Sequence, residues 1–206
     1  MISLLTIILF LIISLGVGGF AFIRYLRDIK ETNKKLKWLE KRHYSLLRIM
    51  VPKNNAKSPL AAEQMFAALH GIYRKGEVLQ EHFSFEMAAT SQSINFYMLV
   101  PTQLRDFIEG QVYAQYPTVE IEAVKDYSQV SVEGRAFAGT EVALVKNDYF
   151  PIRTFPNFDV DPLAGITGVL SKIEEGELLA IQAVMSPIDD SWQKEGIQYV
   201  RNVKEG

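Results

Sequence analysis

The feature that most constrains this chain is an uncharged apolar run at its amino end, from Ile2 to Ile23, which is followed directly by Arg24. As a helix rising ~1.5 Å per residue, the run would be about 33 Å long, enough to cross the ~30 Å hydrocarbon core of a bilayer. A helix also satisfies its backbone hydrogen bonds internally, as a segment in lipid must. The run therefore predicts a transmembrane anchor over residues 1–23.

A secretory signal peptide is the alternative interpretation of this run. Signal peptides carry Lys or Arg before a shorter apolar core and end in a small-residue cleavage pattern. Here only the terminal amine of Met1 precedes the run, and the small-residue stretch from Gly16 to Ala21 lacks an A-x-A pattern before a polar region. These features favour an uncleaved anchor and leave a cleaved signal as the alternative.

A basic stretch, residues 24–43, follows the apolar run and predicts a juxtamembrane helix. It holds eight basic and three acidic residues, a net charge of +5. The positive-inside rule places the stretch and the domain after it in the cytoplasm, with the amino terminus outside the inner membrane. Anionic lipid headgroups are the expected partners, at ~1 kcal/mol for each basic residue near the surface. The basic residues are Arg24, Arg27, Lys30, Lys34, Lys35, Lys37, Lys41 and Arg42.

The same stretch contains a weak pattern for self-association. From Tyr25 to His43 there is no glycine or proline, so we expect a helix continuous with the anchor. Ile29, Leu36 and Leu39 form a thin apolar stripe that Asn33 interrupts. A coiled coil needs a longer heptad pattern, so a homo-oligomer stays an open alternative.

Charge and cysteine content narrow the function of the rest of the chain. The chain has a formal charge of −2, so the part outside the basic stretch carries −7. Nucleic-acid-binding domains normally present a basic face, and we therefore expect no direct nucleic-acid binding. The absence of cysteine excludes disulfides, thiolate zinc sites and cysteine nucleophiles, and it fits a reducing cytoplasm.

Residues 44–190 predict one cytoplasmic α+β domain with the order β-α-β-β-α-β. Two strand-Pro-helix-strand units echo each other, which is typical of a ferredoxin-like sandwich of one antiparallel sheet with two helices on one face. The expected elements are a strand over 45–51, a helix opened by Ser58 and Pro59, strands around 83–86 and 94–100, a helix from Pro101 to Tyr116, and a strand over 119–124.

A further β-α-β unit is expected to extend this sandwich. Glu141 to Val145 reads as a strand, Asp161-Pro162 opens a helix over 163–173, and residues 177–185 alternate as a last strand. The final residues, 191–206, are predicted to be a carboxy-terminal tail or a truncated linker.

An aromatic loop over residues 147–160 is the candidate docking site. Its aromatic side chains are Tyr149, Phe150, Phe155 and Phe158. Aromatics in a loop usually pin it to its own domain, and a partner-docking surface is the sharper alternative.

The sequence nominates no catalytic, cofactor-binding or metal-binding residue. The two stretches nearest to a phosphate loop, 71–78 and 134–141, lack the lysine after the second glycine. His43, His70 and His82 lack metal-ligand spacing and are read as structural or surface residues. Gly165 and Gly168 match an RNA-clamp spacing but are attributed to close helix packing. The adjacent acids, Glu174-Glu175 and Asp189-Asp190, resemble helix-end and turn residues rather than an acid and base pair.

Three strings carry a resemblance to a known family: Pro52 to Gly71, Leu104 to Pro117 and Asp161 to Lys172. They resemble a membrane-anchored domain of candidate-phyla bacteria (Patescibacteria) that typically precedes an ATPase like those of type IV secretion and conjugative transfer. The resemblance implies a membrane-tethered, non-catalytic scaffold or docking module, with a secretion-type ATPase in cis or in trans. It supplies no site residues. This chain departs from the pattern because it reaches Gly206 without a motor domain, so a fragment, a split gene product and a stand-alone adaptor all fit.

A second class of function is kept beside this one. The rival is a self-contained single-pass membrane protein with a small-ligand-binding or enzymatic role. A G-x-x-x-x-G-K-[ST] motif in frame after residue 206, or in a neighbouring gene, would favour the docking module.

Overall fold

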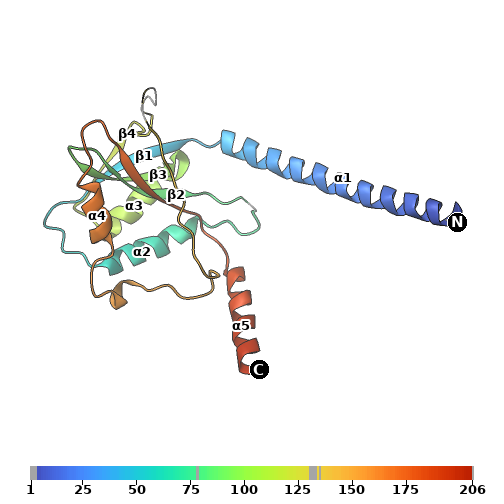
Figure 1. Ribbon diagram of the computed structural model, residues 1–206. Coiled ribbons are helices and arrows are strands. Elements are labelled where there is room, and N and C mark those ends of the chain that lie inside the picture. Colours follow the sequence, from blue (N-terminus) through green and yellow to red (C-terminus); the bar gives the residue numbers. More distant parts are fainter. Residues whose placement is uncertain (1–3, 78, 130–133, 135, 206) are drawn as a thin grey trace. The chain divides into compact units, whose positions relative to one another are not determined.

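The computed structural model describes the backbone of residues 4–77, 79–129, 134 and 136–205, and the side chains of these from Ser14 to Lys204. The chain divides into two compact units, residues 1–43 and residues 44–206 (Figure 1).

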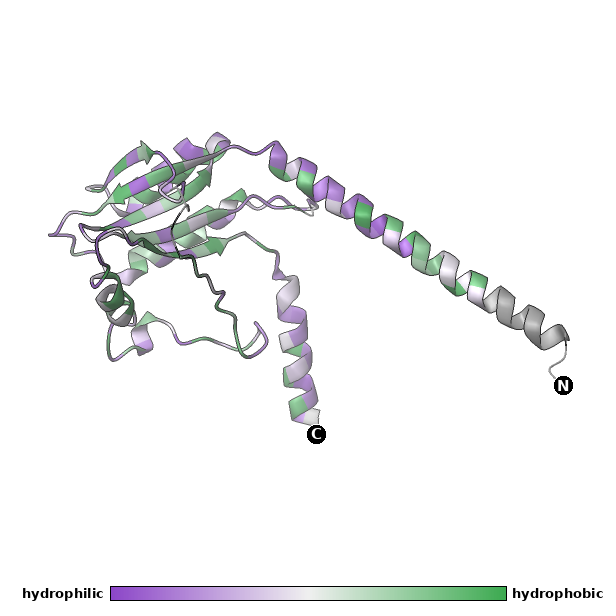
Figure 2. Ribbon diagram, turned by 45° about the horizontal axis from the view of Figure 1, so that its top comes forward, coloured by the Kyte–Doolittle hydropathy of each residue, from purple (hydrophilic) through white to green (hydrophobic). Residues whose placement is uncertain are grey.

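The first unit is one long helix, α1, from Leu4 to Glu40. From Leu4 onward it carries the apolar run and most of the basic stretch without a break, as the lack of Pro predicts. Figure 2 shows its described apolar residues giving way to hydrophilic ones toward the carboxy end. In the stretch with described side chains, Leu15, Phe20 and Ile23 are exposed, at 82%, 69% and 60%.

The predicted transmembrane anchor falls largely on residues 1–13, whose side chains lie outside the described part of the structure. In the part that is described, no helix combines the length and the apolar character needed to cross a bilayer.

The second unit has a mixed α+β architecture built on a five-stranded antiparallel sheet, which confirms the predicted α+β class. The strands lie in the order β4-β1-β3-β2-β5, and every neighbouring pair is antiparallel. The strands are β1 (Tyr44–Met50), β2 (Phe83–Ala89), β3 (Ile94–Pro101), β4 (Glu120–Val124) and β5 (Leu179–Met185).

The helices follow the strands in the predicted alternation. Helix α2 connects β1 to β2, and α3 connects β3 to β4, so residues 44–124 have the order β-α-β-β-α-β. Helix α4 precedes β5, and α5 follows it (Figure 1). The helices are α2 (Pro59–Leu69), α3 (Arg105–Gln115), α4 (Leu163–Leu170) and α5 (Gln193–Glu205); short 3-10 turns span His70–Ile72, Thr102–Leu104, Phe155–Asn157 and Asp190–Trp192.

One face of the sheet packs on α2 and α3 and forms the core. Leu47 pairs with Met98 across β1 and β3, and both are almost fully buried against Leu69 of α2 and Ile108 of α3. Because side chains alternate along a strand, Leu46 and Arg48 of β1 point to the opposite face. That second face is called the open face below.

The predicted strand Glu141 to Val145 is wrong, because these residues form no ladder in the structure. Val142 and Val145 are 93% and 101% exposed. An alternating pattern makes a strand only where a neighbouring strand supplies hydrogen bonds. The position beside β2 is filled by β5 instead, so the predicted β-α-β extension reduces to α4 and β5.

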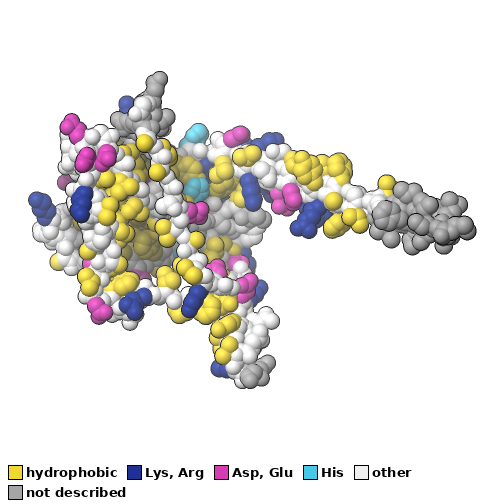
Figure 3. All heavy atoms as spheres, in the orientation of Figure 1, with side chains coloured by type: hydrophobic (Ala, Val, Ile, Leu, Met, Phe, Trp, Pro, Cys, Tyr) yellow, Lys and Arg dark blue, Asp and Glu magenta, His cyan; other side chains and the backbone are white. Residues whose placement is uncertain are grey.

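Residues 193–205, within the predicted carboxy-terminal tail or truncated linker, form helix α5. The physical reason is an apolar stripe at helical spacing, Ile197 and Val200, next to Tyr199. Hydrophobic side chains are visible along this helix in Figure 3.

Candidate docking site

Two aromatic residues of the predicted docking loop, Tyr149 and Phe150, pack against helix α5. The ring centroid of Tyr199 lies 5.6 Å from that of Tyr149 and 5.2 Å from that of Phe150. The rings of Tyr149 and Phe150 are themselves 4.8 Å apart. Such distances are within the favourable range for aromatic pairs, so this triple of rings fixes the loop to α5.

A glycine in α5 permits this close approach. A Cβ atom at Gly196 would lie 3.0 Å from the Cβ of Tyr149. Glycine inside a helix costs ~1 kcal/mol relative to alanine, and the closeness of the loop is the physical reason for it at this position. The side chain of Tyr149 therefore packs directly against the backbone of α5 at Gly196.

The loop and helix enclose a shallow groove of about 500 Å³. Its lining is mainly apolar and includes Tyr149, Phe150, Trp192, Ile197 and Val200. Two cationic residues of α5, Arg201 and Lys204, also line it. We call these residues, together with Tyr199, Gly196, Pro151 and Gln193, the aromatic groove. None of the described residues that line it is acidic, so its chemistry suits an apolar segment that carries negative charge.

A further cation lies at the edge of the aromatic groove. The Nζ atom of Lys146 sits 5.4 Å from the ring centroid of Phe150, within cation–π range. The interaction adds to the positive character of this surface.

The structure separates the four predicted docking residues. Tyr149 and Phe150 line the aromatic groove, whereas Phe155 and Phe158 do not. Phe155 begins a 3-10 turn that ends at Asn157. Phe155 and Phe158 are exposed to a similar degree, at 38% and 39%. Only two of the four predicted docking residues therefore line the aromatic groove.

The α5 residues of the aromatic groove were not nominated from the sequence. The signal was present in Ile197 and Val200, three residues apart, and in Tyr199 beside them.

A polar row crosses the open face of the sheet. Register places Glu122, Arg48, Tyr97, Glu86 and Gln182 side by side on β4, β1, β3, β2 and β5. An Arg48 guanidinium nitrogen lies 2.6 Å from a Glu122 carboxylate oxygen at one end of the row. This row is built from neighbours in space that lie far apart in the chain.

Glu86 is the buried member of the polar row, at 5% exposed. The hydroxyl groups of Ser84 and Tyr127 both donate to its carboxylate. Burial, followed by the hydrogen bond to Glu86, raises the pKa of Tyr127. In this cluster Tyr127 is the hydrogen-bond donor and Glu86 is the acceptor, so the bond ties Tyr127 to β2.

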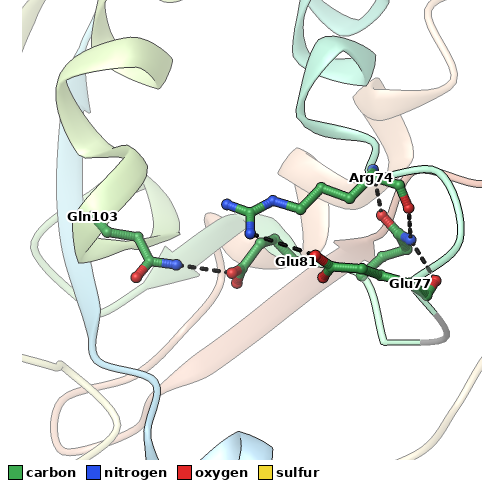
Figure 4. Close-up of polar contacts among 5 residues, drawn as sticks. Arg74, Glu77, Glu81 and Gln103 are labelled. Carbon is green, nitrogen blue, oxygen red and sulfur yellow. Dashed lines mark hydrogen bonds and ion pairs between the residues drawn. The ribbon is translucent and has the colours of Figure 1, made fainter.

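A second polar cluster ties the loop before β2 to the start of α3 (Figure 4). The Gln103 amide donates to the buried Glu81 carboxylate at 2.8 Å. Gln80 accepts from the Arg74 backbone N–H and donates to the carbonyls of Arg74 and Glu77. Arg74 and Glu77 form a long, exposed ion pair of 3.7 Å. These contacts hold a turn in place.

The histidines have structural partners where the structure shows them. His82 shares a hydrogen bond of 3.1 Å with the hydroxyl of Tyr44, and His70 bonds the carbonyl of Ile188 at 2.9 Å. His43 is exposed. In the residues that the structure describes, no group of three His, Asp or Glu side chains is arranged to hold a metal ion.

Of two further motif predictions, one is confirmed and one is wrong. Asp189 accepts from the backbone N–H of Ser191 at 3.0 Å and caps a 3-10 turn, which confirms the turn-residue interpretation. The hydrogen bonds from Ser191 lower the pKa of Asp189. The prediction of close helix packing at Gly165 and Gly168 is wrong, since no described neighbour lies within 4 Å of a Cβ atom built at either position.

Comparison with known proteins gives one match. No curated protein and no solved structure matches the chain. A protein family described as "Domain of unknown function (DUF8128)" matches residues 25–205, which include the sheet, α5 and all of the basic stretch except Arg24. The match covers most of the chain, so this protein belongs to the DUF8128 family.

Proposed function

We propose that this protein is a membrane-tethered docking module, without catalytic activity of its own, that serves an ATPase of the type IV secretion or conjugative-transfer kind. The anchor, the basic stretch and the aromatic groove are the parts that such a module needs.

The observation that carries the tether is the uncharged run from Ile2 to Ile23. Its described residues belong to a continuous helix whose apolar side chains, such as Phe20 and Phe22, are exposed at 69% and 60%. Large apolar surface exposed to water is unfavourable, and a lipid environment would remove that cost. The +5 charge that follows favours a cytoplasmic domain.

The sheet supports a ferredoxin-like sandwich as the scaffold of this module. The strand order β4-β1-β3-β2, with α2 and α3 packed together, is what two interleaved β-α-β units produce. Such a scaffold carries many unrelated functions, so the fold alone does not select one.

The aromatic groove is the proposed contact for the ATPase. Interface hot spots are commonly Trp, Tyr and Arg in an apolar setting, and Trp192, Tyr199 and Arg201 provide them here. The link to a secretion-type ATPase rests on the resemblance of the three sequence strings described above.

The tether is tested by fractionating cells that express the full chain. We expect the protein in the membrane pellet after washing with 1 M salt, because a spanning helix outlasts the screened attraction of the basic stretch. Added protease should reach the domain only after the cells are opened. Release by salt, or cleavage of the domain in intact cells, would contradict the tether.

Docking is tested with the product of an adjacent or fused gene that carries a G-x-x-x-x-G-K-[ST] motif. Val200→Glu places a charge in the aromatic groove and should weaken binding at least tenfold. Val203→Glu is the matched control, because Val203 lies on the same helix but outside the groove lining. Equal binding by both variants would contradict this use of the groove, and the absence of any such ATPase gene would favour the rival, a self-contained ligand-binding or enzymatic protein.

A further inference from the structure

Strand β5 forms one edge of the sheet and pairs on one side only. Its partner is β2, and no other described strand lies beside it. An edge strand presents a row of backbone N–H and C=O groups that another strand can use. The outer side of β5 is therefore a ready template for strand addition.

The sequence of β5 contains none of the features that normally protect an edge. Leu179 to Met185 includes no charged residue, no proline and no glycine. Its central residues are exposed, with Ile181 at 38% and Val184 at 66%. Proteins usually guard such an edge with charges, proline or a bulge.

The opposite edge of the sheet is guarded. Strand β4 is only five residues long and carries Glu120 and Glu122. Pairing of two such strands around a twofold axis would bring four carboxylates together, and like charges across strands are destabilising. The two edges thus differ in the property that decides whether a strand can pair with its own copy.

We propose that β5 pairs in antiparallel fashion with β5 of a second copy of this chain, which joins two five-stranded sheets into one continuous sheet. A twofold pairing uses the same surface on both copies and closes, so it gives a dimer and not a fibre. It also pairs the strand with a copy of its own sequence, which an uncharged strand tolerates because no like charges meet.

Side-chain size selects the register of this pairing. If Gln182 lies opposite Gln182 of the other copy, Val184 faces Ala180 and Ile181 faces Ala183. Ile181 and Val184 then each meet an alanine, one on each face of the sheet, and Leu179 meets Met185 at the strand ends. Pairing centred one residue earlier would instead set Ile181 against Ile181. The two central glutamine amides can also hydrogen-bond each other, since each has a donor and an acceptor.

The natural chain has no cysteine, so single-cysteine variants of the full chain report contacts without a background. Directly opposed residues in antiparallel strands have Cα atoms ~4.5–5.5 Å apart, which a disulfide can bridge. Under mild oxidation in detergent, Gln182→Cys should form covalent dimers at least tenfold faster than Ala180→Cys or Val184→Cys alone. Glu122→Cys on β4 is the matched edge control and should not cross-link.

A mixture of variants removes any dependence on the geometry of one position. Ala180→Cys and Val184→Cys, mixed and allowed to exchange, should form a covalent heterodimer, because the proposed register sets these residues opposite each other. If neither Gln182→Cys nor the mixture cross-links above the Glu122→Cys control, the proposal is overturned.

The chain itself offers one competing occupant of the β5 edge, the exposed strand-like segment over residues 141–145. If that segment covers β5, the double variant Val142→Cys/Gln182→Cys will form a disulfide within one chain, and the covalent dimers will be absent. That outcome overturns the proposal, whereas covalent dimers of Gln182→Cys with no intrachain bond in the double variant support it.

Discussion

The hydroxyl of Tyr127 donates a hydrogen bond of 2.7 Å to a carboxylate oxygen of Glu86. This bond joins parts of the chain next to β4 and β2, two strands that β1 and β3 separate in the sheet. Tyr127 follows β4, and Glu86 lies in β2. The Tyr127 ring stacks on Tyr97 of β3 with centroids 4.8 Å apart. The chain that leaves β4 therefore crosses the open face as a strap, and Tyr127 fastens it.

Removing the Tyr127 hydroxyl should loosen this strap. Tyr127→Phe keeps the ring that stacks on Tyr97 but leaves a buried carboxylate with one donor fewer. Hydrogen bonds to charged groups contribute ~1.5–3 kcal/mol, so we expect the free energy of unfolding to fall by about that amount in urea melts. Tyr113→Phe, on the surface of α3, should change it by less than ~0.5 kcal/mol; equal effects would show that Tyr127 does not fasten the strap.

Stability should also fall at alkaline pH because of the same residue. Burial raises the pKa of Tyr127 above its ordinary value of 10.0, so the folded state holds the phenol proton more tightly than the unfolded state. The contribution is complete below pH 10 and is lost as the pH rises through the folded-state pKa. Urea melts from pH 8 to pH 11 should show this loss.

The Tyr127→Phe variant is the control for the alkaline loss. It should lose less stability between pH 10 and pH 11 than the natural chain does. A smaller loss should persist, because burial also raises the pKa of Tyr116. Identical pH profiles for the two proteins would show that the proton of Tyr127 is not the cause.

A larger side chain at Gly196 should separate α5 from the aromatic loop. In Gly196→Leu the new Cβ atom would lie 3.0 Å from the Cβ of Tyr149, and the branches beyond it would need space that the Tyr149 ring fills. We expect faster amide hydrogen exchange in residues 193–205, since α5 loses its tertiary contacts. Exchange in β1 and β3 should stay unchanged, and unaltered exchange in α5 would contradict the packing described here.

Alanine at Gly168 should have the opposite effect and stabilise the domain. Gly168 lies within α4, and a Cβ atom there meets no described neighbour within 4 Å. Gly168→Ala should raise the free energy of unfolding by ~0.5–1 kcal/mol through helix propensity. A destabilised variant would indicate a close neighbour at this glycine and would revive the close-packing interpretation.

Local sequence signals located most of the elements of the domain. Pro59 marks the start of α2 and Pro101 marks the end of β3, and the apolar spacing that includes Leu69 and Ile108 predicts the buried faces of α2 and α3. These signals work because capping, proline geometry and helical periodicity depend on residues a few positions apart.

The same signals failed where a partner decides the structure. Residues 141–145 alternate like a strand, but β5 occupies the position beside β2, and residues 141–145 pair with no described strand. The sequence predicts one side of the aromatic groove, because Tyr149 and Phe150 stand out as aromatic residues in a loop. It does not predict the other side, because their partner Tyr199 lies about 50 residues away in a helix.

By itself, the sequence determined the apolar run at the amino end, the +5 stretch after it, the α+β class and the order of elements over residues 44–124, because each depends on composition or on short-range periodicity. Only the tertiary structure decided that Tyr127 reaches Glu86, that α5 meets Tyr149 at Gly196, and that β5 rather than residues 141–145 is the edge strand beside β2. Those contacts join residues far apart in the chain, and their free energy depends on which surfaces fit together once the core has formed.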